Sequence, residues 1–308
     1  MSDQSNVHGV TVTVPLGLLS CSFVYKISRL INHHLGRFFR ISISRYSSTI
    51  SIYSSSDDLQ LYSSSANEYN FSGLNIGSGF FSHPSWECVD LPAQSSIYKS
   101  VQGRRGVDFI ALDLNQQSLR SHFGARSFDA IYSSHTLEHL SRTKHQDLFY
   151  DVHYILKKSG VFRVCIPDIL SLFYAAVGSL PPFAEYATLF FIREAYTPLY
   201  YELSKMTDLK RAKCISDIHR RICNMSPTDV FDWFVNLSDT LSDVNALYPP
   251  DYHISYPTAA YLEELAKMAG FSLSFSTSRG ISTLPAFSNK FLFDTTIPNL
   301  SLYMEFIK

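Results

Sequence analysis

The sequence predicts an α/β fold with a largely parallel sheet of seven strands flanked by helices. From residue 71 onward, short apolar runs alternate with stretches of helical periodicity, which is the pattern of successive βαβ units. Residues 171–256 break this alternation with helical patterns separated by prolines, and they are too long for a simple connection. We therefore expect a helical insertion after the fifth strand, and two closing strands behind it.

The expected strands are short apolar runs, five before the insertion and two after it. They are Gly73–Ile76, Glu87–Asp90, Phe109–Leu112, Ala130–Ser133, Val161–Ile166, Ser272–Thr277 and Leu302–Ile307. The expected helices follow the 3.6-residue period. They are Arg142–Lys157, Leu170–Val177, Phe183–Ala195, Leu209–Cys223, Thr228–Leu241 and Thr258–Ala269. Gly160 is a predicted stop for the first of them.

Residues 1–70 differ in composition from residues 71–308, so we treat the two as separate regions. The first region is rich in serine, and serine runs are typical of mobile linkers. Within it, apolar residues from Phe23 to Phe38 recur at helical spacing with Lys and Arg between them, which predicts a basic amphipathic helix. Such a helix packs on the domain or a partner, or lies peripherally on a membrane surface.

The composition excludes several classes of protein. The 308 residues carry 26 basic and 27 acidic side chains, a formal charge of −1, so no global basic field attracts nucleic acid. The five cysteines form no CxxC pair, and no apolar run is long enough to span a membrane. We expect a cytoplasmic protein, with membrane contact limited to the amphipathic helix.

A glycine turn and an acidic residue follow the first two strands of the sheet. Gly77-Ser78-Gly79 follows the first strand and should open a helix, because glycines allow close approach to a ligand. Asp90 ends the second strand, where a carboxylate can accept both hydroxyls of a ribose. A dinucleotide-binding fold has this acid about 20 residues after the glycines, together with a third glycine. Here Ser82 replaces that glycine and Asp90 lies only 11 residues past Gly79, which disfavours a dinucleotide oxidoreductase.

The third and fourth strands also end in polar residues at the carboxyl edge of the sheet, where ligands bind in open α/β folds. Asp113-Leu114 suits an adenine, with Asp113 as a helix N-cap the alternative. Phe128–Leu140 ends in Ser133, His135 and the adjacent pair Glu138-His139. Because adjacent helical residues point in different directions, the pair does not form a two-turn zinc motif, and we expect no metal.

These segments, in this order and spacing, resemble a class I S-adenosylmethionine-dependent methyltransferase. The similarity is to the small-molecule branch associated with polysaccharide and lipopolysaccharide biosynthesis. Leu156-Lys157, Arg163 and Pro167-Asp168 match the motifs of that branch, whereas Ser85 and Ser159 stand where it has glycine. The resemblance covers residues 71–170 well and 251–308 loosely, and it implies a Rossmann-like class I methyltransferase fold.

The resemblance also implies S-adenosylmethionine as the cofactor and assigns residues to its parts. Gly77, Ser78 and Gly79 would pack on the methionine portion. Asp90 would hold the ribose with Leu91 beside the adenine, which Asp113 and Leu114 would frame. Ser133 and His135 would line the cofactor near the sulfonium. Each residue is taken from the matching position of this sequence.

The acceptor implied by the resemblance is a small molecule, with a sugar or glycan precursor the favoured class. A hydroxyl acceptor needs a general base. We predict His139 and Asp168 as catalytic residues, with His135, His219 and His253 as further candidates. Both predicted residues have a structural alternative: His139 caps or packs at its own helix, and Asp168 caps the next helix. The alternative function is a non-catalytic methyltransferase-like binding module.

Overall fold

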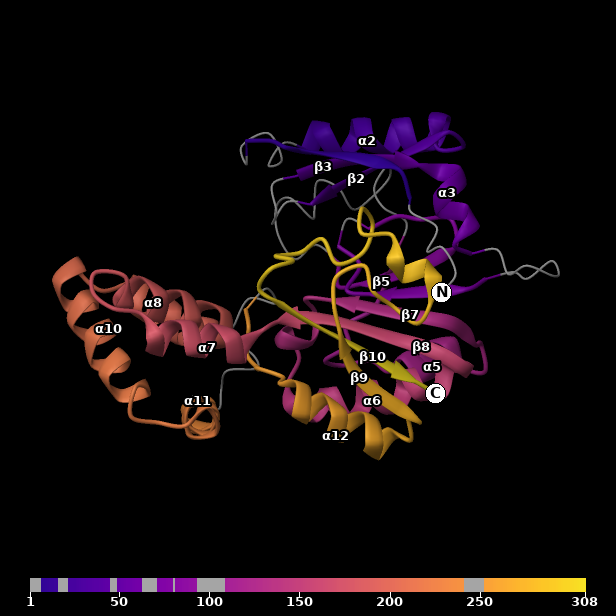
Figure 1. The fold of residues 1–308 in the computed structure, drawn as a ribbon. Helices are drawn as coiled ribbons and strands as arrows, with labels where there is room; N and C mark the ends of the chain where they lie inside the picture. The colour runs from indigo at the N-terminus through magenta and orange to yellow at the C-terminus, as the bar shows by residue number, and fades with distance from the viewer. Residues whose placement is uncertain are drawn as a thin grey trace.

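The computed structural model describes residues 7–15, 22–44, 49–62, 71–79, 81–92, 109–240 and 252–308. Its main sheet has seven strands in the order β6-β5-β4-β7-β8-β10-β9. The strands are β4 (Gly73–Ile76), β5 (Trp86–Asp90), β6 (Ile110–Ala111), β7 (Phe128–Ser134), β8 (Leu156–Pro167), β9 (Leu273–Thr277) and β10 (Ser301–Ile307). Helices α5 (Leu119–Phe123), α6 (Arg142–Ile155) and α12 (Ala259–Ala269) flank them (Figure 1).

The sheet is parallel from β6 through β8, and only β10 runs antiparallel to its neighbours β8 and β9. This confirms the predicted largely parallel, Rossmann-like sheet of seven strands. Successive strands are added on one side of β4 as far as β6, and the chain then returns to place β7 on its other side. A reversal of strand order opens a crevice at the carboxyl ends of the strands, which is where ligands bind in such sheets.

Two local predictions are wrong. No helix opens at the glycine turn: the described residues 77–79 and 81–85 are irregular or in turns, and β5 begins at Trp86. The connection is short, and Pro84 disfavours helical geometry at His83. Gly160 does not stop a helix either. Helix α6 ends at Ile155 and the chain enters β8 directly. Gly160 lies inside the strand, where an added Cβ would lie 2.8 Å from the Leu156 side chain.

The serine-rich region contains a three-stranded antiparallel sheet that the sequence analysis does not predict. Strands β1 (Gly9–Thr13), β3 (Thr49–Ser54) and β2 (Phe39–Ser44) pair in that order, with helices α2 (Ser22–Leu35) and α3 (Ser55–Gln60) beside them (Figure 1). Serine alternates with isoleucine in β2 and β3, so each strand has one polar and one apolar face. The serine content hides this two-residue period.

Helix α2 occupies most of the predicted amphipathic segment, but it packs through its small and polar residues. Ser28 is buried, and the Asn32 side chain accepts from the Ile41 amide at 2.7 Å and donates to its carbonyl at 2.9 Å. Leu30 is 59 % exposed and Ile27 is 40 % exposed. Peripheral membrane contact through this face stays a prediction. Among the described helices, none is long and apolar enough to cross a membrane.

The N-terminal unit is fastened to the main sheet by a buried carboxylate. Asp58 of α3 lies 2.8 Å from His83 Nε2, just after the glycine turn, and accepts a hydrogen bond of 2.6 Å from Asn289 in the C-terminal loop. Tyr53 of β3 stacks near Phe291 with ring centroids 5.9 Å apart. The boundary predicted near residue 70 is therefore bridged by buried contacts, and its status as a domain boundary stays a prediction.

The expected helical insertion forms a lobe beside the sheet (Figure 1). It contains α7 (Ile169–Gly178), α8 (Ala184–Ala195), α9 (Thr197–Ser204), α10 (Asp208–Ile222) and α11 (Pro227–Thr240). The lobe has an apolar core of its own, which includes Phe173, Phe191 and Phe234. Helix α9 is not predicted from sequence, where prolines separate the helices. Pro198 instead lies in its first turn, where proline is tolerated.

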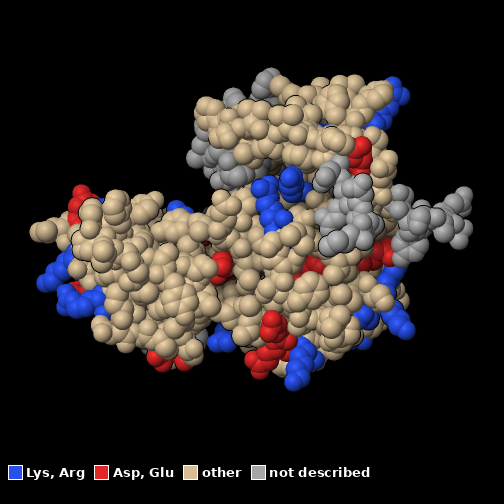
Figure 2. All heavy atoms as spheres, in the orientation of Figure 1, with Lys and Arg blue, Asp and Glu red and all other residues tan. Residues whose placement is uncertain are grey.

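Charges of both signs are scattered over the surface. On the face shown in Figure 2, Lys and Arg alternate with Asp and Glu over the lobe and the sheet domain, and no large single-sign field covers the described residues of this face.

A fully buried arginine ties the C-terminal loop to the sheet. Arg163 of β8 contacts Asp294 at 2.5 Å and Glu305 at 2.7 Å, and all three side chains have no exposed area. It also donates to the carbonyls of Ser278 and Ile281 at 3.0 Å. The two carboxylates therefore depend on Arg163 for compensation of their charge in a water-free setting.

We expect Arg163→Met to lower the free energy of unfolding by about 3–5 kcal/mol, because it leaves two carboxylates buried without their cation. Urea denaturation measures this. Arg126→Met is the matched control, since Arg126 is 56 % exposed in its ion pair with Glu87 and should contribute at most about 1 kcal/mol. Equal losses in both variants would contradict the role given to Arg163.

Candidate functional site

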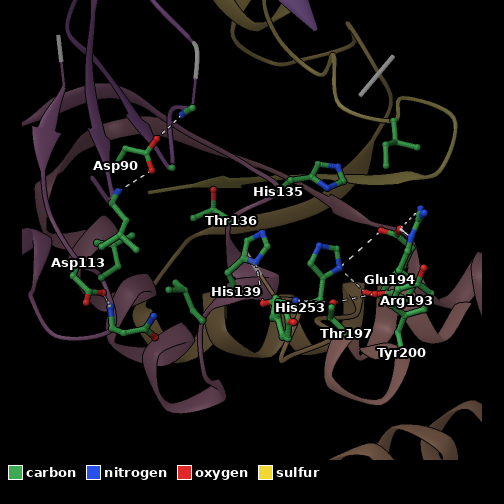
Figure 3. Close-up of a pocket in the computed structure, with 18 of the residues that line it drawn as sticks. Asp90, Asp113, His135, Thr136, His139, Arg193, Glu194, Thr197, Tyr200 and His253 are labelled. Atoms are coloured by element: carbon green, nitrogen blue, oxygen red, sulfur yellow. Dashed lines mark hydrogen bonds and ion pairs between the residues drawn. The ribbon is translucent and has the colours of Figure 1, made fainter. Parts of the chain in front are cut away.

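A cavity of about 510 Å³ opens at the carboxyl ends of the parallel strands. Figure 3 shows Asp90 and Asp113 on one side of it, His139 and His253 in the middle, and Arg193, Glu194 and Thr197 on the other side. The first side comes from the sheet and the last from the helical lobe. The cavity therefore spans two structural units.

The glycine turn forms a tight wall of the cavity. Gly77 has φ +67° and Gly79 has φ +54°, conformations that favour glycine. The Gly77 amide donates to the carbonyl of Val89 at 2.8 Å, which anchors the turn to β5. A Cβ on Gly77 would lie 2.0 Å from Thr136 Oγ1. The close approach to Thr136 therefore requires glycine at position 77.

Two carboxylates follow the ends of neighbouring strands. Asp90 is buried, and its Oδ2 accepts from the Gly79 amide at 2.8 Å while its Oδ1 accepts from the Leu91 amide at 2.8 Å. Asp113 accepts from the Asn115 amide at 2.9 Å, so it caps a turn rather than a helix. Leucine side chains lie between and beside the two acids. These are Leu91, Leu112 and Leu114, which give the sheet side of the cavity an apolar slot between two acceptors.

The segment after β7 contributes an ion pair at the centre of the site. His135 has φ +50°, and its Nδ1 lies 3.1 Å from Glu138 Oε1. Burial alone lowers the pKa of His135, but hydrogen bonds to Cys165 and Glu138 and the charge of Glu138 raise it to about 10. Burial raises the pKa of Glu138, but the hydrogen bond and charge of His135 lower it to about 2. The pair is therefore ionised at neutral pH.

Two histidines from distant parts of the chain lie in contact at the centre of the cavity. His139 lies in the short helix η1 (Leu137–His139), and His253 precedes α12. Their ring centroids are 4.9 Å apart. The His139 Nδ1 donates to the Tyr252 carbonyl at 3.0 Å, and the His253 Nδ1 donates to the Glu194 carbonyl at 2.7 Å. Burial lowers the pKa of His139, which favours its neutral form.

The lobe supplies the remaining wall. Thr197 and His253 exchange two hydrogen bonds of 3.0 Å, which fix the start of α9 against the returning chain. Arg193 is paired with Glu194 at 2.6 Å. The other side chains of this wall are aromatic: they are Tyr200, Tyr201 and Tyr252, and the rings of the last two lie 5.1 Å apart. This wall combines charge, hydroxyls and aromatic faces.

Most of the predicted site residues line this one cavity. They are Gly77, Gly79, Asp90, Leu91, Asp113, Leu114, His135 and His139. Ser78 and Ser133 are buried and do not line it. Asp168 is the N-cap of α7, where it accepts from the Ser171 amide at 3.0 Å and hydroxyl at 2.6 Å. Its catalytic role stays a prediction, and the structure shows its capping role.

Sequence reasoning alone misses most of the lobe residues of the site. Arg193, Glu194, Thr197, Tyr200 and Tyr201 carry no local signal, because nothing in a helical pattern shows which helix end meets the sheet. His253 is the one residue of this side named as a candidate from sequence, and it lines the cavity. His219, a further candidate from sequence, lies on α10 outside the cavity lining, with its Nδ1 2.9 Å from Thr188 Oγ1.

A buried histidine contacts the main chain of η1. His145 of α6 lies with Nε2 2.7 Å from the carbonyl oxygen of Leu137 and 3.3 Å from Ser255 Oγ. Burial lowers its pKa to about 4, against the opposing effects of the Leu137 carbonyl and Glu138. The folded protein therefore holds this imidazole neutral at neutral pH, and its protonation opposes folding.

Comparison with known proteins gives one family match. Residues 87–164 match the methyltransferase domain family, which is about a quarter of the chain and includes Asp90, Asp113, His135 and His139. No curated protein matches the sequence.

Several solved methyltransferases share distant structural similarity. The S-adenosylmethionine-dependent methyltransferase SibL, in its apo form, has a TM-score of 0.34 and 15 % identity over 77 % of this chain and 50 % of its own. The plantazolicin methyltransferase BpumL in complex with SAH has a TM-score of 0.38 and 14 % identity over 77 % of this chain and 76 % of its own. An S-adenosylmethionine-dependent methyltransferase from Mesorhizobium loti has a TM-score of 0.38 and 13 % identity over 81 % of this chain and 96 % of its own. These TM-scores are too low to carry an argument about activity, and the chain spans only half the length of SibL.

The native protein should lose stability on acidification partly through His145. The unfolded chain binds a proton on this imidazole near pH 6.5, whereas the folded chain does so only near 4. Stability is therefore lost as pH falls through this window, by about 3 kcal/mol at most. Urea midpoints between pH 7.5 and 4.5 should fall less steeply in His145→Gln. The exposed His122→Gln is the control and should follow the native curve; a His145→Gln curve equal to the native one would contradict this account.

Proposed function

We propose that this protein is an S-adenosylmethionine-dependent methyltransferase that acts on a small-molecule acceptor. One observation carries the proposal: Gly77, Gly79, Asp90 and Asp113, from three successive strand ends, line a single cavity. These are positions at which the methyltransferase resemblance predicts cofactor contacts. The family match over residues 87–164 supports the same reading.

The sheet side of the cavity suits the parts of this cofactor. The glycine turn leaves space for the methionine portion, because neither Gly77 nor Gly79 carries a side chain there. Asp90 offers carboxylate oxygens that can accept from the ribose hydroxyls, and Asp113 lies one strand further along the edge. The leucines between the two acids provide an apolar slot for the adenine ring. His135 and Thr136 lie toward the centre of the cavity, where the sulfonium would face the acceptor.

Methyl transfer depends more on the alignment of cofactor and acceptor than on strong catalytic groups. The bond from sulfur to the methyl carbon breaks as a bond from the acceptor to that carbon forms, and S-adenosylhomocysteine leaves as a neutral thioether. The acceptor also gives up its proton. Holding both molecules in line and excluding water account for much of such a rate enhancement. The helical lobe covers the acceptor side of the cavity and serves this purpose.

The acceptor side favours a small polar molecule such as a sugar or glycan precursor. Tyr200, Tyr201 and Tyr252 present aromatic faces that can cover the apolar face of a sugar ring, and their hydroxyls can bond its oxygens. Arg193 and Glu194 add a donor and an acceptor at the same wall. Labelled methyl transfer to nucleotide-sugar pools tests this class. Cofactor binding without transfer to any pool would instead support the non-catalytic binding module.

We expect S-adenosylhomocysteine to bind with one site per chain in calorimetric titration, and Asp90→Asn to weaken it by about 10- to 100-fold. The variant loses a charged acceptor, and hydrogen bonds to charged groups contribute about 1.5–3 kcal/mol. Asp217→Asn is the control, because Asp217 is 53 % exposed on α10 beside Arg220. Absence of binding by folded native protein would remove the proposal.

Substituting Gly77 should also weaken the binding of S-adenosylhomocysteine. Gly77→Ala places a Cβ 2.0 Å from Thr136 Oγ1 and displaces the turn, so we expect at least about tenfold weaker binding, or 1.4 kcal/mol. Gly124→Ala is a matched control: Gly124 also has positive φ, +60°, but its Cβ would meet nothing within 4 Å. Both variants suffer backbone strain, and only the first alters the cavity. Equal affinities in the two variants would show that the turn does not contact the cofactor.

A further inference from the structure

Three metal-ligating side chains converge between the two sides of the cavity. A ring nitrogen of His139, a ring nitrogen of His253 and a carboxylate oxygen of Glu138 lie within 4.8 Å of one another. His139 and His253 both line the cavity, and Figure 3 shows them side by side at its centre. The group thus lies between the expected places of cofactor and acceptor.

Hydrogen bonds hold both imidazoles in the tautomer that binds a metal. A carbonyl oxygen only accepts, so the contacts to Tyr252 and Glu194 place a proton on Nδ1 of each ring. Nε2 of each ring then carries the lone pair, and no hydrogen bond to either Nε2 occurs among the described residues. Metal-binding histidines are almost always oriented by donating their other N–H to a carbonyl or carboxylate.

The carboxylate of Glu138 has an oxygen without a partner. Its side chain is only 1 % exposed, and Oε1 is paired with His135 Nδ1 at 3.1 Å. Oε2 is buried and, like Oε1 apart from this ion pair, accepts no hydrogen bond from the part of the chain that the structure describes. A buried carboxylate oxygen normally has a partner, since the unsatisfied group costs about 1–3 kcal/mol or more. This orphaned oxygen indicates that a ligand belongs beside it.

We propose that Glu138, His139 and His253 bind one divalent transition-metal ion of the Zn²⁺ type. Two imidazoles and one carboxylate are a common ligand set for such ions, whereas Mg²⁺ and Ca²⁺ prefer oxygen ligands alone. Around Zn²⁺, ligands at about 2.0–2.1 Å lie about 3.4 Å apart, so the three side chains draw together by a small rotamer change on binding. Asp90 and Asp113 line the same cavity and add negative charge to it, whereas Glu194 is paired with Arg193.

The ion has a role in acceptor binding, a part of the inference that rests on the proposed function. Three protein ligands leave a coordination position open. Because His139 and His253 line the cavity, an oxygen of the acceptor can occupy that position. His139 then acts as a ligand that positions the acceptor, and the acceptor class narrows to molecules with a hydroxyl or carboxylate oxygen to offer.

Metal binding by the untagged, chelator-treated chain tests the site without any methyl transfer. Calorimetric titration with Zn²⁺ should give one ion per chain, and Co²⁺ should produce the visible absorption bands of a four- or five-coordinate site. His253→Ala and His139→Ala should each weaken Zn²⁺ binding by at least about 100-fold. Loss of a residue that only hydrogen-bonds a metal ligand has a smaller effect. The exposed His122→Ala is the matched control and should bind as the native chain does.

S-adenosylhomocysteine titration separates this inference from the proposed function. His253→Ala should keep the native far-UV circular-dichroism spectrum, which shows that the variant is folded while its metal site is lost. Metal binding by a native chain that does not bind S-adenosylhomocysteine would uphold the site and remove the proposed function. Absence of stoichiometric Zn²⁺ binding by native protein, or equal loss in the His122 and His253 variants, would overturn the metal site.

Discussion

The main-chain carbonyl of Glu138 holds the two halves of the site together. It accepts from the amides of Ile254 at 2.8 Å and Ser255 at 3.2 Å, and the Ser255 hydroxyl donates to the neighbouring carbonyl of Leu137. These bonds close an excursion of 116 residues through β8 and the whole helical lobe. They also bring His253 opposite His139, so the geometry of the cavity depends on a backbone contact rather than on any catalytic group.

The sheet side of the site is predictable from sequence because parallel strands share an edge. Once Gly73–Ile76, Glu87–Asp90 and Phe109–Leu112 are predicted as parallel strands, the residues that follow them must gather at one crevice. The structure confirms that gathering for Gly77, Asp90 and Asp113. Their chemical roles are proposed on the resemblance and on the cavity they share.

The lobe side is not predictable in this way. His139 reaches Tyr252 across 113 residues, and no periodic pattern links those positions. The expectation of no metal considered only Glu138 and His139 with the spacing of a helical zinc motif. The third candidate ligand comes from a segment brought back by the Glu138 contact. In the N-terminal region, serine content similarly conceals the alternation of β2 and β3, because hydroxyl side chains also suit the polar face of a strand.

The separate apolar core of the lobe has an evolutionary consequence. Phe173, Phe191 and Phe234 stabilise the lobe from within, while Tyr200 and Tyr201 lie on its cavity side. The sheet is stabilised by a different set of residues, including Phe149 and Phe162. Tyr200 also packs against the lobe core, whereas Tyr201 is part of neither core, so a substitution of Tyr201 changes the cavity wall and leaves both cores intact. The acceptor wall can therefore change at such a position while the strand ends that line the other side of the cavity stay constant.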